Sequence, residues 1–152
     1  MPTDPTNRPG EWYAGGLRFK CTQCGNCCTG PPGTVWFTPA EGRAMAGQLE
    51  LDEAAFYRMH AHQVDGRWSL REHRTPAGYD CVFLDRRSVP EKAVCSVYET
   101  RPAQCRTWPF WPENLVSKQA WTNVKRRTPC PGMGRGPLVP IVEIRVQRDA
   151  TP

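Results

Sequence analysis

The sequence predicts a small, irregular α+β domain, rich in loops, with short helices and a small β-hairpin. Leu, Ile, Val and Phe supply only 16% of the 152 residues, below the roughly 20% expected of a globular chain. The 13 Gly and 16 Pro interrupt regular structure often. Six Trp, five Phe and four Tyr argue against disorder, and eight Cys offer cross-links in place of a large core. We therefore expect one stapled domain with one core.

Helix-start signals dominate the first half of the chain. Thr38 begins a Thr-Pro-Ala-Glu run with the pattern of a capping box and a proline in the first turn, which predicts a helix over residues 39–49. Asp52 caps a second predicted helix over residues 53–62. The other segments expected here are a mobile arm at 1–18, a Cys/Gly loop at 21–33, a short strand at 34–37 and a half-buried strand at 67–74.

The second half is expected to hold a hairpin, two helices and a final extended segment. Runs of strand-forming residues at 80–85 and 93–98 flank a polar stretch, which predicts the hairpin. Pro102 is placed to start a short helix that carries Cys105. The last elements are a helix over 113–127, with Leu115, Val116 and Val124 facing inward, and an extended segment over 138–146. The predicted organisation is an arm at 1–18, a cysteine-cluster domain at 19–134 and an extended C-terminal segment at 135–152.

Composition excludes several classes of protein. The first residues lack the apolar stretch of a signal peptide, and the longest apolar stretch, residues 138–142, is far too short to cross a bilayer. We therefore expect a cytoplasmic protein without a membrane partner, in reducing surroundings that disfavour structural disulfides. The net charge of +5 permits an acidic partner but does not demand nucleic acid. No catalytic triad, phosphate-binding loop or dinucleotide fingerprint occurs.

The strongest signal is the distribution of the eight Cys. Four lie within eight residues at C-x2-C spacing and end in an adjacent pair, and four follow singly along the chain. A C-x2-C turn lets two thiolates face one metal ion, and Gly25 supplies the backbone freedom that the turn needs. Distant ligands closed by a metal would contribute the folding free energy that the thin core lacks. The candidate metal ligands are Cys21, Cys24, Cys27, Cys28, Cys81, Cys95, Cys105 and Cys130.

Ligation by Cys alone suits either an iron–sulfur cluster or zinc. Cys21, Cys24 and Cys27 have the C-x2-C-x2-C spacing that often holds a cluster together with one remote Cys, so a 4Fe-4S cluster is favoured over Zn2+. Eight thiolates suffice for two four-cysteine sites, or for one site with four thiols left over, and both arrangements stay open. Disulfides are the weaker explanation, because adjacent Cys27 and Cys28 cannot form a relaxed one with each other.

Longer motifs carry a resemblance to a known family. The runs Cys24-Gly25-Asn26-Cys27-Cys28 and Cys81-Val82-Phe83-Leu84, and the C-x-x-Y-E-x-R-P-x-x-C-R run from Cys95 to Arg106, resemble the YkgJ-type cysteine-cluster proteins. All eight Cys fall on the family pattern. The family has a CxxCxxCC signature and is described as zinc- or iron-chelating, and sometimes as an iron–sulfur oxidoreductase. Similar clusters in iron–sulfur flagellin lysine methylases favour iron. The resemblance implies metal binding without naming a substrate.

Two arginines flank the single Cys105. Arg101 and Arg106, together with the start of the short helix, are expected to lower the pKa of Cys105 and to support the metal from beside its ligands. His60 and His62 are expected not to bind metal, because two helical residues at that spacing point about 200° apart.

Three aromatic residues follow Cys105 closely. Trp108, Phe110 and Trp111 would suit base stacking beside the basic residues Lys118, Lys125, Arg126 and Arg127. The favoured interpretation is structural: these rings cover the metal site and replace missing aliphatic side chains, because aromatics bury much area with few residues.

The predicted function is that of an intracellular protein whose Cys hold an iron–sulfur cluster or zinc, in electron transfer, metal handling or assembly, with a redox or protein partner. One alternative is a small iron–sulfur oxidoreductase, which a substrate pocket would favour. Another is a zinc-stapled interaction module that binds an acidic protein or nucleic acid through Arg126, Arg127 and Arg135. Nucleic acid is the less favoured partner.

Overall fold

The computed structural model describes residues 11–152, and these form two compact units. Residues 11–22 and 107–151 make up the terminal unit, and Gln23–Arg106 with Pro152 make up the central unit. Each unit has a hydrophobic cluster of its own. The α+β class predicted from the sequence is confirmed, but the expectation of a single core is wrong. Aromatic rings bury enough area per residue for each small unit to build a separate core.

Two helices of the central unit begin as the local signals predict. Helix α1 spans Pro39–Gln48, and its capping box is complete: Thr38 Oγ1 accepts from the Glu41 amide at 3.2 Å, and Glu41 Oε1 accepts from the Thr38 amide at 2.8 Å. Helix α2 spans Glu53–His60 and is capped by Asp52, which accepts from the Ala55 amide at 2.7 Å. It ends two residues earlier than predicted, because Ala61 already begins a strand.

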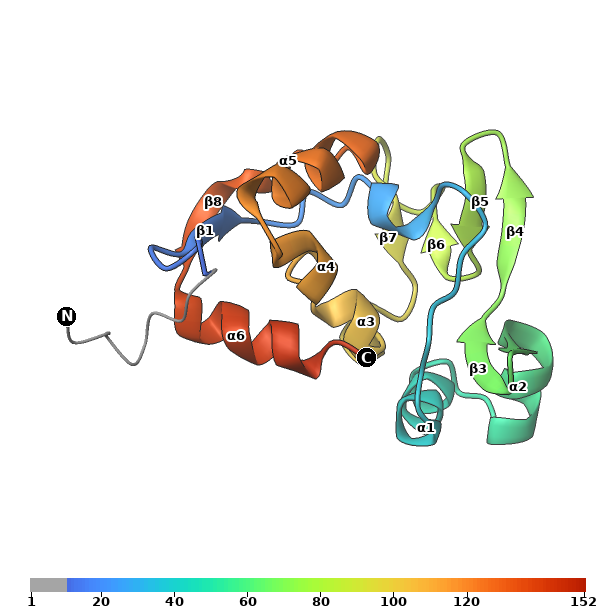
Figure 1. Cartoon of the computed structure of the whole chain (residues 1–152). Helices are drawn as coiled ribbons and strands as arrows, with labels where there is room; N and C mark the ends of the chain where they lie inside the picture. Colours follow the sequence, from blue (N-terminus) through green and yellow to red (C-terminus); the bar gives the residue numbers. More distant parts are fainter. Residues whose placement is uncertain (1–10) are drawn as a thin grey trace. The chain divides into compact units, whose positions relative to one another are not determined.

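Three antiparallel hairpins follow in the central unit (Figure 1). They pair β2 (Ala61–Val64) with β3 (Arg67–Leu70), β4 (Glu72–Thr75) with β5 (Gly78–Cys81), and β6 (Leu84–Asp85) with β7 (Val94–Cys95). The single strand expected over 67–74 is therefore two strands of different hairpins. The predicted hairpin is confirmed for β6 and β7, whereas Asp80 and Cys81 pair back to β4.

The core of the central unit is mainly aromatic. Phe56 is fully buried and stacks on Phe83, with ring centroids 6.2 Å apart, and Phe37 meets it edge to face. Cys81 is buried in the same cluster, and Cys28 and Cys95 pack against it. Short helical turns complete the unit: η1 (Asn26–Cys28), η2 (Tyr98–Thr100) and α3 (Ala103–Arg106). Three of the eight Cys thus belong to or border one core.

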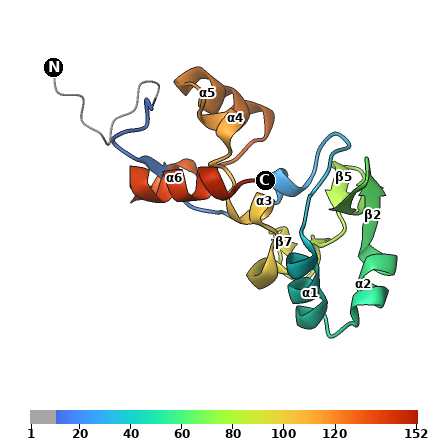
Figure 2. The ribbon, with the colours of Figure 1, turned by 60° about the horizontal axis from the view of Figure 1, so that its bottom comes forward.

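The terminal unit joins a two-stranded ribbon to three helices. Strand β1 (Leu17–Phe19) pairs with β8 (Met133–Val139), and α4 (Pro112–Leu115), α5 (Lys118–Arg127) and α6 (Ile141–Ala150) complete it; α4 and α5 lie side by side in Figures 1 and 2. Its core includes Phe110, Trp121 and Ile144. None of the helices between residues 11 and 152 is long and apolar enough to cross a membrane.

Three sequence predictions are corrected in the terminal unit. The helix expected over 113–127 is interrupted at Val116, which is 71% exposed rather than inward-facing, because the Ser117 hydroxyl caps a new helix by accepting from the Ala120 amide. The extended segment expected over 138–146 is wrong from Ile141 onward, where α6 begins and buries Ile144 on one face. The β-branched residues of α6 suggested a strand, but packing overrides propensity.

The mobile arm expected at residues 1–18 is only partly covered, since residues 1–10 lie outside the described residues. From Glu11 onward the chain is packed. Tyr13 is 4% exposed, and the buried carboxylate of Glu11 accepts from Arg145 at 2.8 and 3.0 Å. The described part of the expected arm therefore belongs to the terminal unit.

Candidate metal centre

The Cys-rich loop makes a tight turn at Gly25. This residue has a left-handed φ of 77° and precedes the η1 turn that carries Cys27 and Cys28. A Cβ at Gly25 would lie 2.5 Å from the Cβ of Ala93, next to strand β7. Only glycine combines this φ with so close an approach, so Gly25 lets the loop reach the hairpin that carries Cys95.

Backbone hydrogen bonds fasten the loop on both sides. The Ala93 amide, two residues before Cys95, donates to the Gln23 carbonyl at 2.9 Å. The Tyr79 amide, two residues before Cys81, donates to the Gly30 carbonyl at 2.8 Å. These bonds hold Cys24–Cys28 between the two strands that end in Cys81 and Cys95.

Asp80 is a further anchor of this loop, and the sequence patterns did not single it out. It is 1% exposed and accepts a bidentate pair from Arg86, at 2.8 Å from Nε and 3.0 Å from Nη2, while the Thr29 hydroxyl donates to the same carboxylate. These hydrogen bonds outweigh burial and lower the pKa of Asp80 to about 2. Asp80 therefore ties the end of the Cys loop to strand β5 as a buried anion. A lone Asp beside Cys81 carries no sequence signal that would reveal this role.

Helix α3 positions Cys105 through its neighbours. Gln104 bridges to the segment before α1: its side-chain amide donates to the Thr34 carbonyl at 2.9 Å, and its carbonyl oxygen accepts from the Trp36 amide at 2.9 Å. The Ala103 amide donates to Glu41 Oε2 at 2.6 Å. Three contacts to the region around α1 thus fix the short helix, although its own four residues are too few for a stable isolated helix.

These fastenings bring four Cys of the central unit into one electrostatic group: Cys27, Cys81, Cys95 and Cys105. Each pKa is raised. For Cys27, which is exposed, the main cause is the hydrogen bond with the Cys28 thiol, whose sulfur lies 3.8 Å away. For the other three the main cause is burial, which raises the pKa of Cys81 to about 11. In all six pairings among the four, a negative charge on one thiol raises the pKa of another.

The expected lowering of the Cys105 pKa is wrong. Burial and the charges of the other thiols raise it, and Arg101 acts in the opposite direction but more weakly. Arg101 also favours the charged forms of Cys27 and Cys95, so its positive charge acts on the group; its support of a bound metal stays a prediction. Arg106 instead pairs with Glu41 at 3.4 Å and is 55% exposed at its side chain. It is not among the charges that shift these thiols.

The four thiols fit a thiophilic metal by their chemistry. Within residues 11–152 no three Cys, His, Asp or Glu side chains share coordinating geometry, and all eight Cys are free thiols. Buried neutral thiols need not converge on one point, and ionising several together is costly without a nearby cation. A bound cation would lower each pKa and draw the sulfurs together. The group therefore has the ligand type and the charge demand of a zinc or iron site.

The remaining Cys are divided between the units. Cys24 is half-buried and accepts from the Asn26 amide at 3.5 Å, and a charge on Cys28 acts on Arg86. Cys21 and Cys130 belong to the terminal unit, where the Lys20 amide donates to the Gly132 carbonyl at 3.2 Å.

The His and aromatic candidates have structural places. His60 packs against Phe83 with ring centroids 4.9 Å apart, and burial lowers its pKa. Phe110 is 1% exposed in the core of the terminal unit, and Trp108 and Trp111 pack edge to face 4.8 Å apart. These rings replace missing aliphatic side chains in the terminal unit, as predicted, and do not form an exposed stacking platform; that they cover the metal site stays a prediction.

Comparison with known proteins agrees with the Cys constellation. An uncharacterized protein of Methanocaldococcus jannaschii is 29% identical over 99 residues, which cover 64% of this chain and 48% of that protein. The chain thus spans about half the length of that relative. No solved structure matches. The profile of the CxxCxxCC family, described as a "Putative zinc- or iron-chelating domain", matches residues 20–131. The chain belongs to this CxxCxxCC family of metal-chelating domains.

Proposed function

We propose that the chain holds an iron–sulfur cluster through Cys27, Cys81, Cys95 and Cys105 and serves in electron transfer, metal handling or cluster assembly. The observation that carries this proposal is the group itself: four thiols from four separate segments, each within electrostatic range of the other three. The match to a zinc- or iron-chelating family supports metal binding.

An iron–sulfur cluster suits the way the thiols are supplied. In a four-iron cluster each iron takes one Cys thiolate, so four well-separated segments can each contribute one ligand. When bound, such a cluster supplies one-electron exchange. The chain itself buries Cys81, half-buries Cys95 and Cys105, and leaves Cys27 exposed. A centre with one exposed ligand would lie near the surface, where a redox partner or a metal donor can reach it.

Arg101 supplies charge balance in this proposal. Four thiolates around a cluster carry net negative charge, and Arg101 favours the charged form of three of them. Its guanidinium is held in place by stacking over the Tyr98 ring at 3.8 Å and by donating from Nε to the Tyr98 carbonyl at 3.0 Å. A fixed cation beside the ligands would raise cluster affinity and reduction potential.

Metal analysis tests the proposal directly. Anaerobically purified protein is expected to contain iron and acid-labile sulfide, and Cys→Ser changes at 27, 81, 95 or 105 should each remove them. Ser96→Ala, an exposed neighbour of Cys95, is the matched control and should keep full content. Stoichiometric zinc without sulfide would replace the cluster by a zinc site. Full iron content in the four Ser variants would refute the ligand assignment.

A further inference from the structure

The net positive charge of the protein lies on one unit. Residues 23–106 of the central unit contain ten Arg and Lys and ten Asp and Glu, which cancel. Residues 11–22 and 107–151 of the terminal unit contain nine Arg and Lys but only four Asp and Glu, an excess of five. The charge is therefore a property of the terminal unit alone, and it is independent of the proposed metal site.

Most of these cations have no ion-pair partner among residues 11–152. Arg145 and Arg148 form ion pairs with Glu11 and Asp149. The other seven are exposed and form no ion pair with any residue between 11 and 152: Arg18, Lys20, Lys118, Lys125, Arg126, Arg127 and Arg135. We call these seven the basic face. Unpaired like charges repel one another, so this arrangement costs stability unless an anionic partner neutralises it.

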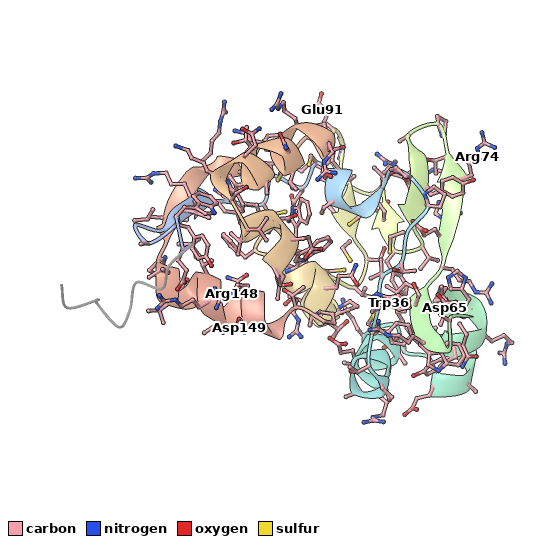
Figure 3. All side chains as sticks on the ribbon, in the orientation of Figure 1. Trp36, Asp65, Arg74, Glu91, Arg148 and Asp149 are labelled. Atoms are coloured by element: carbon pink, nitrogen blue, oxygen red, sulfur yellow. The ribbon has the colours of Figure 1, made fainter. Side chains whose placement is uncertain are left out.

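The basic face gathers on α5 and the β1–β8 ribbon, from which nitrogen-tipped side chains project outward (Figure 3). Arg18 Nη1 donates to the Gly136 carbonyl at 3.0 Å, and Lys125 Nζ lies 3.5 Å from the position that a Cβ on Gly134 would occupy. A Cβ on Gly136 would lie 2.6 Å from the Cβ of Lys20. Arg18, Lys20 and Lys125 therefore lie next to the exposed Gly134–Gly136 stretch, in which Arg135 adds a further cation.

The surroundings favour a protein over nucleic acid as the partner. Leu138, directly opposite Arg18 in the ribbon, is 51% exposed and offers an apolar contact amid the cations. The aromatic rings that could stack on bases are instead packed, with Phe110 and Trp121 in the core. An apolar spot ringed by charge is typical of a protein interface with a polar rim. We propose that the basic face docks an acidic protein surface, in which carboxylates surround an apolar side chain.

Two charge-reversed proteins with the same net charge test this inference. One carries Lys118→Glu, Lys125→Glu and Arg135→Glu on the basic face. The matched control carries Arg58→Glu, Arg74→Glu and Arg87→Glu on the central unit, where all three are exposed and form no ion pair with described residues; Arg74 projects outward in Figure 3. Metal content and circular dichroism are measured for both, so that a failure of metal binding is seen separately from a failure of docking.

The probe is a fluorescent peptide of Glu and Asp interspersed with Leu, titrated with each full-length protein. Charge reversal on the basic face is expected to weaken the affinity for the peptide by about tenfold or more, and the control reversal by much less. Raising the salt concentration from about 50 to 200 mM should also weaken the affinity of the wild type for the peptide. If charge reversal on the basic face disturbs folding, the same three residues are changed to Gln instead. This variant should still bind the peptide more weakly than a control in which Arg58, Arg74 and Arg87 are changed to Gln. Equal weakening in both triple variants, no peptide binding by the wild type, or tighter binding of a duplex DNA than of the peptide would each overturn the inference.

Discussion

Replacing the buried anchor Asp80 by Asn should loosen the Cys loop. Asp80 is 2% exposed at its side chain, against 38% for Arg86. Lowering its pKa from 3.8 to about 2 corresponds to about 2 kcal/mol of folding free energy at neutral pH. Arg86 can turn to solvent after the change, and the Thr29 hydroxyl can still donate to the Asn carbonyl oxygen, so we expect a loss of about 2 kcal/mol rather than the 3–5 of a fully buried pair.

The effect has a defined pH dependence. Because the pKa of Asp80 is depressed in the folded state, its stabilising contribution is fully present above about pH 4 and is lost as the pH falls toward 2. The Asp80→Asn protein should therefore unfold at lower guanidinium concentration than the wild type at pH 7, and the two should converge as the pH approaches 2. Metal content should fall as well, because the anchor holds the loop beside Cys81.

Asp65→Asn is the matched control for this experiment. Asp65 is exposed in the β2–β3 turn with a φ of 52°, a conformation that Asn also adopts readily, so its change should stay within about 0.5 kcal/mol. If Asp80→Asn and Asp65→Asn unfold alike at pH 7, or if the Asp80 variant keeps the acid dependence of the wild type between pH 4 and 2, the anchoring role is refuted.

Three further predictions concern single positions. Gly25→Ala should lower the free energy of unfolding by more than about 1 kcal/mol and reduce metal content. The control Gly47→Ala, in open space within helix α1, should raise the free energy of unfolding by up to about 1 kcal/mol. Equal shifts of the denaturant midpoint in the two variants would contradict this prediction. Because burial lowers the pKa of His60, the stability of the wild type should decline as the pH falls below 6.5. His60→Gln should remove the part of the decline that His60 causes. A denaturation midpoint with the same pH profile in this variant as in the wild type would contradict the prediction. Arg101→Gln should shift the reduction potential or lower the metal content of the purified protein. Arg106→Gln should do neither, because Arg106 pairs with Glu41. Equal effects of the two changes in voltammetry and metal analysis would contradict the role of Arg101.

Local signals in the sequence determined much of the chemistry. The Thr38 capping box acts within four residues, and α1 begins where it predicts. The order and spacing of the Cys pointed to the family and to a thiol-ligated metal, because ligand type alone selects the class of metal. Each of these properties depends on a residue and its close neighbours along the chain.

Only the tertiary structure decided which thiols influence one another and in what direction their pKa values shift. The spacing of Cys21, Cys24 and Cys27 predicts one grouping, whereas in the folded chain the charge of Cys27 raises the pKa of Cys81, Cys95 and Cys105, which come from distant segments. Burial reversed the expected pKa shift of Cys105. The role of Asp80 depends on Thr29 and Arg86, which approach from different segments. Desolvation and charge–charge energies depend on everything packed around a group, and that surrounding is assembled from residues far apart in the sequence.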